Sequence, residues 1–252
     1  MKIQVVAALA TAFGLSACAT MSAPSPSPIV TPSAGRTFLS PTPALTVTTY
    51  GTGQPVTRYW QAVPQDEVRM LLSLPVESAV IEEISTSGGA NLLGSGINLR
   101  KGRYRATYYY YRTRSERCST QPAHGNVFTG IGIRITADIE TTQAGVNIAD
   151  LMGLAAAAQR GAARGQLSIE AIGISSSTSS ITPYLQASSG LTVDGLRKAV
   201  ESFGVVKAIA DTPSVSLTPY TVYLEAQNPE GCIAALSQQR AATVQGASSN
   251  SQ

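Results

Sequence analysis

One segment of the chain, residues 129–141, alternates strictly between apolar and polar residues. The apolar positions are Ile131, Ile133, Ile135, Ala137 and Ile139, and between them lie Gly132, Arg134, Thr136, Asp138 and Glu140. Because successive side chains of a strand point to opposite faces, this period of two predicts a strand with one buried and one wet face. The chain must therefore build an antiparallel sheet that is covered on one side.

Most of the remaining pattern is of the same kind. Strands are predicted at residues 45–50, 56–63, 103–113, 166–174 and 217–226, with a bulge near Ala171. Residues 70–74 and 79–86 are apolar runs whose pattern does not distinguish a strand from a helix. Helical spacing occurs at 148–160, at 193 to about 203 after the N-cap candidate Thr192, and at 229 to about 240 after Asn228. We predict an α+β fold, mainly antiparallel sheet with two or three short helices.

The start of the chain has the pattern of a secretory signal. A lone Lys2 precedes an apolar stretch at residues 5–15, and small residues follow it. The stretch is too short to span a bilayer as a permanent helix, and Thr11 and Gly14 interrupt it. A cleaved signal peptide is therefore expected.

The residues Leu15-Ser16-Ala17-Cys18 resemble the lipobox of bacterial lipoproteins. In that family the cysteine becomes the mature N-terminus and carries acyl chains, so the resemblance implies lipidation at Cys18 and a signal peptide at 1–17. Ala19, in place of Asp, implies the outer membrane, with the domain facing the periplasm. The triacylated cysteine of the family supplies the several chains that stable anchoring needs. The alternative is an ordinary signal peptide that happens to contain a cysteine.

Composition divides the rest of the chain. Residues 18–44 are rich in Ser and Pro and predict an extended tether. Residues 45–240 are expected to form the α+β envelope domain, as one unit or two subdomains. The small and polar residues 241–252 predict a disordered tail.

The chain has three cysteines and one histidine. With lipid on Cys18, an oxidising envelope favours a disulfide between Cys118 and Cys232, and two buried free thiols are the alternative. These two cysteines and His124 lie too far apart in the sequence to match a zinc spacing. We predict no metal and no cofactor.

No catalytic motif stands out in the sequence. His124 lies in a loop-like Pro-Ala-His-Gly context, and no serine is nominated as its partner. Asp138 and Glu140 share a strand face with Arg134, which favours a solvated, ion-paired surface over an acid–base pair. Glu82 and Glu83 are adjacent, so on a strand they point apart. No residue is therefore predicted to be catalytic.

One cluster favours binding. Arginines and Lys101 crowd around a run of tyrosines between residues 100 and 117, and on a strand Arg103, Arg105, Tyr109 and Tyr111 share one face. Arginine beside aromatic rings binds phosphates, carboxylates or sugars. The candidate binding surface consists of Arg103, Arg105, Tyr109, Tyr111, Arg112 and Arg114. The alternative is that one tyrosine face packs in the core while the arginines form a wet surface that guards a sheet edge.

These observations predict a protein with a structural or accessory binding role in the cell envelope. Its expected partners are the membrane, through the N-terminal lipid, and an anionic envelope glycan or lipid headgroup, or another envelope protein. The formal net charge of +3 does not favour nucleic acid. The alternatives are a subunit of an envelope secretion or pore assembly, because its alternating strands also suit membrane barrels, and a periplasmic hydrolase with an unrecognised site.

Overall fold

The computed structural model describes residues 36–50, 54–84, 90–93, 99–118, 125–148, 150–176, 182–236 and 238. Side chains are described for all of these except residues 90–93 and Thr182. The predicted signal peptide, Cys18, the first part of the tether, His124 and the tail at 241–252 lie outside the described residues.

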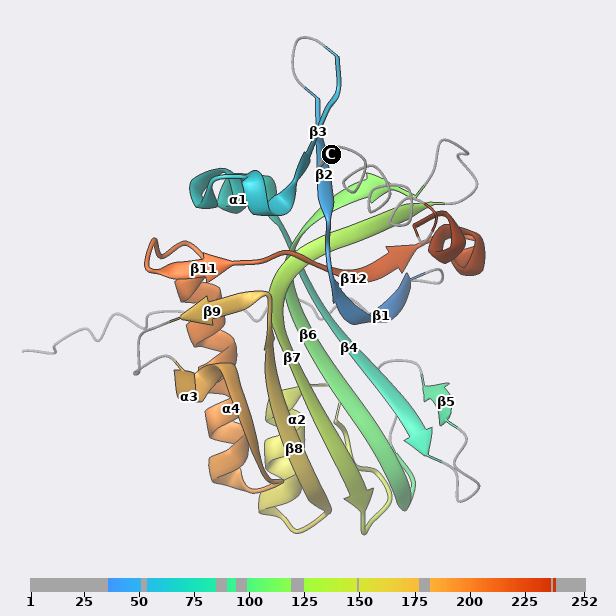
Figure 1. The fold of residues 1–252 in the computed structure, drawn as a ribbon. Helices are drawn as coiled ribbons and strands as arrows, with labels where there is room; N and C mark the ends of the chain where they lie inside the picture. The colour runs from blue at the N-terminus through green and yellow to red at the C-terminus, as the bar shows by residue number, and fades with distance from the viewer. Residues whose placement is uncertain are drawn as a thin grey trace, which may run out of the picture.

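The elements lie along the chain as a run of strands followed by alternating helices and strands (Figure 1). They are β1 (Arg36–Pro43), β2 (Thr46–Thr49), β3 (Val56–Tyr59), the short 3-10 helix η1 (Trp60–Ala62), α1 (Gln65–Leu71), β4 (Leu74–Ile84), β5 (Ala90–Leu93), β6 (Gly102–Arg117), β7 (Asn126–Thr141), α2 (Leu151–Gln159), β8 (Ala163–Ile172), β9 (Ile174–Ser176), α3 (Thr182–Leu185), β10 (Gln186–Gly190), α4 (Val193–Ile209), β11 (Val215–Leu217) and β12 (Tyr220–Glu225). Residues 229–236 form a further helical segment.

A long hairpin of β6 and β7 forms the centre of the main sheet. The two strands pair antiparallel from Gly102–Thr141 to Arg117–Asn126. On its other side β7 has two neighbours, since residues 126–130 pair with β12 and residues 132–141 pair with β8. The sheet order is β1-β12-β7-β6-β4-β5, with β8 and β10 added beside the second half of β7. The hairpin curves from one half of the sheet into the other (Figure 1).

The chain leaves the main sheet at Gly173, directly after β8. Gly173 has a φ of +67°, and a Cβ there would lie 2.2 Å from the carbonyl oxygen of Thr218. Only glycine fits this close approach without strain. Beyond it β9 pairs with β11 in a small separate sheet. The predicted strand at 166–174 is therefore real but ends with a glycine break, two residues beyond the expected bulge at Ala171.

The helices α2 and α4 pack on one face of the β6–β8 part of the sheet. The alternating isoleucines of β7 point into this core, where they meet Leu154 of α2 and Leu196 of α4. Thr192 caps α4 as predicted, because its hydroxyl accepts a hydrogen bond of 3.1 Å from the Gly195 amide. The other side of the same strands carries the polar half of the alternation. Among the described residues, no helix is long and apolar enough to cross a membrane.

The α+β class with a mainly antiparallel sheet is confirmed, but the helices outnumber the two or three predicted. The helices without a predicted counterpart are α1, α3 and η1, which span seven, four and three residues. Such short helices complete too few turns to show a helical period.

The boundary between tether and domain also differs from the prediction. Residues 36–43, which the composition assigned to the tether, form β1 at the edge of the sheet. Pro41 and Pro43 fit there because an edge strand leaves one side free of ladder hydrogen bonds. The pairing with β12 also shifts register between Phe38 and Thr42, around the first proline. Residues 36–43 therefore belong to the domain.

Candidate functional site

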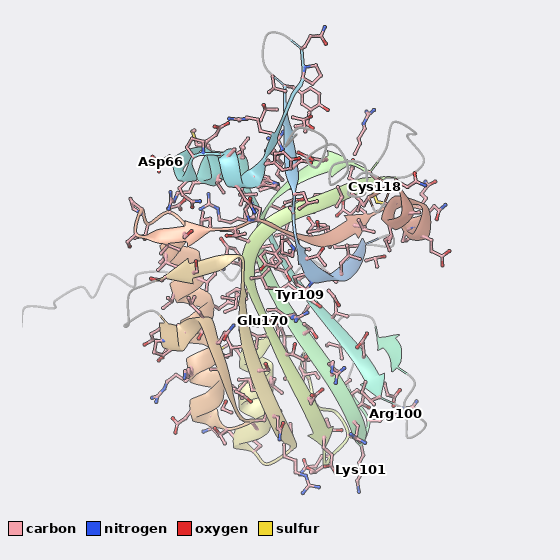
Figure 2. All side chains as sticks on the ribbon, in the orientation of Figure 1. Asp66, Arg100, Lys101, Tyr109, Cys118 and Glu170 are labelled. Atoms are coloured by element: carbon pink, nitrogen blue, oxygen red, sulfur yellow. A yellow bond between two sulfur atoms is a disulfide. The ribbon has the colours of Figure 1, made fainter. Side chains whose placement is uncertain are left out.

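The open face is defined as the side chains of β4, β6, β7, β8 and β10 that point away from α2 and α4. The strand register arranges them in rows across the sheet. We call the end of the sheet where β6 begins and β7 ends its free end. From there inward, the rows are Arg103, Glu140 and Arg164; then Glu82, Arg105, Asp138 and Gln166; then Val80, Thr107, Thr136, Ser168 and Ser188; then Ser78, Tyr109, Arg134, Glu170 and Gln186. Figure 2 shows Tyr109 and Glu170 near the middle of the sheet, and Arg100 and Lys101 at its free end.

Ion pairs join neighbouring strands across the open face. Arg105 donates to Asp138 at 2.8 Å, and Arg134 donates to Glu170 at 3.1 Å through Nε. The sequence predicts an ion-paired surface here, and the structure has one. The partner of Asp138, however, is an arginine of β6, whereas Arg134 of its own strand turns to β8. Exposed pairs of this kind contribute about 0–1 kcal/mol each to stability.

A cleft of about 470 Å³ lies at the free end of the open face. We call it the arginine cleft, and its polar lining consists of Arg103, Arg105, Asp138, Glu140, Arg164 and Gln166. Gly165 of β8 lies beside it with a φ of +152°, and a Cβ there would lie 1.9 Å from the Asp138 carbonyl oxygen. The floor of the cleft therefore depends on the close approach of β7 and β8 at this glycine.

The charges in the arginine cleft are unequally satisfied. Arg164 donates two hydrogen bonds to the Glu140 carboxylate, from Nη2 at 2.9 Å and from Nε at 3.2 Å. This hydrogen bonding lowers the pKa of Glu140, and the charges of Arg164, Arg103 and Lys101 lower it further. Arg103 lies opposite Glu140 in the register, yet within the described part of the chain it has no carboxylate at ion-pair distance. Arg103 is thus an exposed arginine of the cleft without a carboxylate partner among the described residues.

The candidate binding surface predicted from the sequence is divided among different places. Arg103 and Arg105 line the arginine cleft. Tyr109 is half-buried under Phe38, with the ring centroids 4.0 Å apart, and Tyr111 is fully buried. Burial raises the pKa of both tyrosine hydroxyls. The two tyrosines therefore pack the sheet and do not line the cleft.

Arg112 and Arg114 are tied to the protein itself. Arg112 donates to the carbonyl oxygens of Leu72 at 3.0 Å and Arg69 at 3.2 Å, and it pairs with Asp211. Arg114 donates to the carbonyl oxygen of Thr48 at 2.5 Å. Their donors hold other segments of the chain against the far half of β6. The structure thus separates them from Arg103 and Arg105.

Two residues of the arginine cleft, Arg164 and Gln166, were not singled out from the sequence. Both belong to β8, and only the pairing of β7 with β8 brings them beside Asp138 and Glu140. Gln166 begins the strand predicted at 166–174, where its only signal is the polar phase, and Arg164 lies two residues before that predicted strand. Nothing in that phase tells which strand lies alongside.

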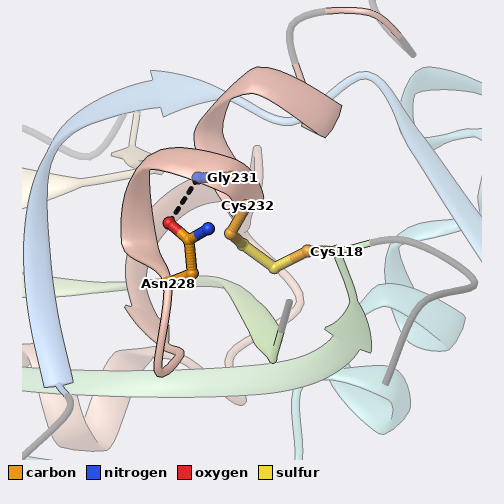
Figure 3. Close-up of a disulfide and its surroundings, with 4 residues drawn as sticks. All are labelled: Cys118, Asn228, Gly231 and Cys232. Carbon is orange, nitrogen blue, oxygen red and sulfur yellow. Dashed lines mark hydrogen bonds between the residues drawn. A yellow bond between two sulfur atoms is a disulfide. The ribbon is translucent and has the colours of Figure 1, made fainter. Parts of the chain in front are cut away.

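A disulfide joins the far end of β6 to the helical segment 229–236 (Figure 3). Cys118 and Cys232 are fully buried, and their Cα atoms are 5.2 Å apart. Asn228 caps the helical segment as predicted, because its side-chain oxygen accepts a hydrogen bond of 2.9 Å from the Gly231 amide. The bridge is consistent with the oxidised pair that the cysteine count predicts.

Within the described ranges, no group of three or more His, Cys, Asp or Glu residues is placed to hold a metal ion. No protein-family model, curated protein or solved structure matches the chain.

Proposed function

We propose that the protein is a lipid-anchored binding protein of the bacterial cell envelope, attached to the membrane at Cys18, whose arginine cleft binds an anionic group of another envelope component. The observation that carries the binding role is the exposed Arg103 in the lining of a cleft with one more arginine than carboxylates. Guanidinium groups bind phosphate and carboxylate through paired hydrogen bonds. The lipobox resemblance supports the anchor.

The state of the carboxylates favours binding over acid–base chemistry. Asp138 accepts a hydrogen bond from Arg105, and both oxygens of Glu140 accept from Arg164. The lowered pKa of Glu140 keeps it ionised near neutral pH, where a general acid needs a proton to give. The arrangement orients arginine donors and leaves Arg103 available for an outside anion.

Arg103→Gln in the full chain tests the binding role, because it removes the spare charge and keeps a polar side chain. Glycerol phosphate and glucuronate are the probes for a lipid headgroup and a glycan, and binding is followed by titration calorimetry. We expect affinity to fall about tenfold, as for the loss of about 1.4 kcal/mol, and to fall with added salt. Arg197→Gln, an exposed arginine on α4, is the matched control and should bind as the parent does.

The outcomes separate the sources of the anion. Binding of glycerol phosphate alone identifies a phosphate ligand, and binding of glucuronate alone identifies a sugar acid. Equal binding by Arg103→Gln and the parent, or no binding of either probe, contradicts the proposed role of the cleft.

The anchor has its own test. Cys18→Ser should abolish the incorporation of an acyl label, since the thiol is the acceptor in the family that the signal resembles. Acyl label on the Cys18→Ser chain would contradict the anchor and leave the cleft untouched.

A further inference from the structure

The hairpin of β2 and β3 projects from the body of the domain (Figure 1, top). Its four cross-strand pairs run from Thr46–Tyr59 to Thr49–Val56, and the two strands form a sheet of their own. An isolated two-stranded hairpin is marginally stable in water, so contacts with the body must hold it in place.

The base of the hairpin is fastened on several sides. Val47 is fully buried, and two side chains near the C-terminal end of β6 form hydrogen bonds with the backbone of Thr48. Glu116 accepts a hydrogen bond of 3.2 Å from the Thr48 amide, and Arg114 donates one of 2.5 Å to the Thr48 carbonyl oxygen. On the other strand Arg58 pairs with Glu67 of α1. These contacts fix the position of the hairpin on the domain.

The outer part of the hairpin exposes large apolar side chains. Tyr50 is 78% exposed and Val56 is 54% exposed, and Tyr59, which pairs with Thr46 at the base of the hairpin, is 45% exposed. Residues 49–57 include no charged side chain. By the alternation of the strands, Tyr50 and Tyr59 lie on one face of the hairpin and Val56 on the other. The outer part of the hairpin therefore exposes one large apolar side chain on each face, Tyr50 on one and Val56 on the other.

We propose that this hairpin inserts among the headgroups of the membrane that carries the anchor. Tyrosine suits that depth because its ring is apolar and its hydroxyl is polar, and aromatic residues concentrate at membrane interfaces. The inference rests on the proposed acylation of Cys18, which lies 18 residues before Arg36. At about 3.1 Å per residue a Pro-rich linking chain reaches about 55 Å, more than the width of about 40 Å expected for a domain of this size.

Two features favour lipid over a protein strand or groove as the occupant. The side chains of Glu116 and Arg114 occupy the amide and carbonyl of Thr48, so that no strand can pair with the hairpin at this point of its β2 edge. A protein groove covers one face of a strand pair, whereas the exposed side chains here lie on both faces. A fluid headgroup layer surrounds both faces at once.

The test uses the full acylated chain in vesicles of phosphatidylethanolamine and phosphatidylglycerol. Gln54→Cys places a free thiol at the hairpin for an environment-sensitive dye, since Cys18 carries lipid and Cys118 is bonded to Cys232. We expect a blue shift of the dye and quenching by lipids with nitroxide headgroups. Adding Tyr50→Ser and Tyr59→Ser should at least halve both signals, while vesicle flotation stays complete. Met152→Ser, which removes an exposed side chain on α2, is the matched control.

Flotation separates the hairpin from the anchor. Floating protein whose dye neither shifts nor is quenched overturns the hairpin proposal and leaves the anchor standing. Protein that does not float overturns both. A dye response that appears only after envelope proteins are added means that the hairpin contacts a protein, and it contradicts the lipid proposal.

Discussion

Phe38 of β1 stacks face to face on Tyr109 of β6, with ring centroids 4.0 Å apart and ring planes 4° from parallel. The two strands are not neighbours, because β12 and β7 lie between them in the sheet. The contact therefore reaches across the bend of the β6–β7 hairpin and closes one end of the open face. The arginine cleft lies at the opposite end of the open face.

Phe38→Ala should destabilise the domain by about 2 kcal/mol, measured as the free energy of unfolding in urea. The loss combines a half-buried phenyl ring with its stacking on Tyr109. Met152→Ala, at an exposed position of α2, should change the same quantity by less than about 0.5 kcal/mol. Equal stability of the Phe38→Ala variant and its parent would show that β1 does not hold the bend.

Arg112→Gln should destabilise the domain, whereas Arg103→Gln should not. The Arg112 side chain is only 16% exposed and bonds two carbonyl oxygens and Asp211, and a hydrogen bond to a charged group contributes about 1.5–3 kcal/mol. Arg103 lies exposed at the cleft. Denaturation of both variants beside the parent checks the pair, and similar midpoints for the two variants would contradict the tie through Arg112.

The sequence predicts local structure well where a strand has one face in the core and the other in solvent along its whole length. The alternation in β7 shows which side chains face the core from Ile131 to Ile139, because every second residue of that stretch lies in the main core. It does not show that Phe128, on the opposite face, is buried in a second cluster. The same period assigns Arg112 and Arg114 to a face of β6. It cannot show that their side chains meet the carbonyls of Leu72 and Thr48, which come from other segments of the chain.

Contacts distant along the chain were the least predictable. β1 looks like tether because Pro41 and Pro43 lower its strand propensity, yet Arg36 pairs with Glu225, 189 residues away. The arginine cleft likewise depends on the register of β7 with β8, which brings Arg164 to Glu140. Local propensity carries no information about such pairings.

Loss of the disulfide should lower stability without changing the fold. Cys118 and Cys232 are 114 residues apart, and a loop of that length contributes roughly 4–5 kcal/mol by restricting the unfolded chain. A Cys118→Ser/Cys232→Ser variant should unfold at a lower urea concentration and keep the parent's circular dichroism. Thiol labelling of the unreduced, denatured mature chain should find no free thiol, and two labelled cysteines would contradict the bridge.

The Glu116 carboxylate accepts a hydrogen bond from the β2–β3 hairpin. Because of this residue, the domain should become less stable as the pH rises just above 4.5, the ordinary pKa of a glutamate. Burial raises the pKa of Glu116, although the Thr48 amide and Arg114 act in the opposite direction. In that range the folded chain holds a proton that the unfolded chain has already lost, so raising the pH favours unfolding.

Glu116→Gln should remove this pH dependence. The amide oxygen still accepts from the Thr48 amide, but no charge is buried, so the variant should be at least as stable as the parent at pH 7. The lowered pKa values of Glu67 and Glu140 act in the opposite direction, mainly at the acidic end of the range, and they are the same in parent and variant, so they cancel in the comparison. Urea unfolding of parent and variant from pH 4.5 to 7 measures the difference, and an identical slope for both would show that burial of Glu116 does not govern its protonation.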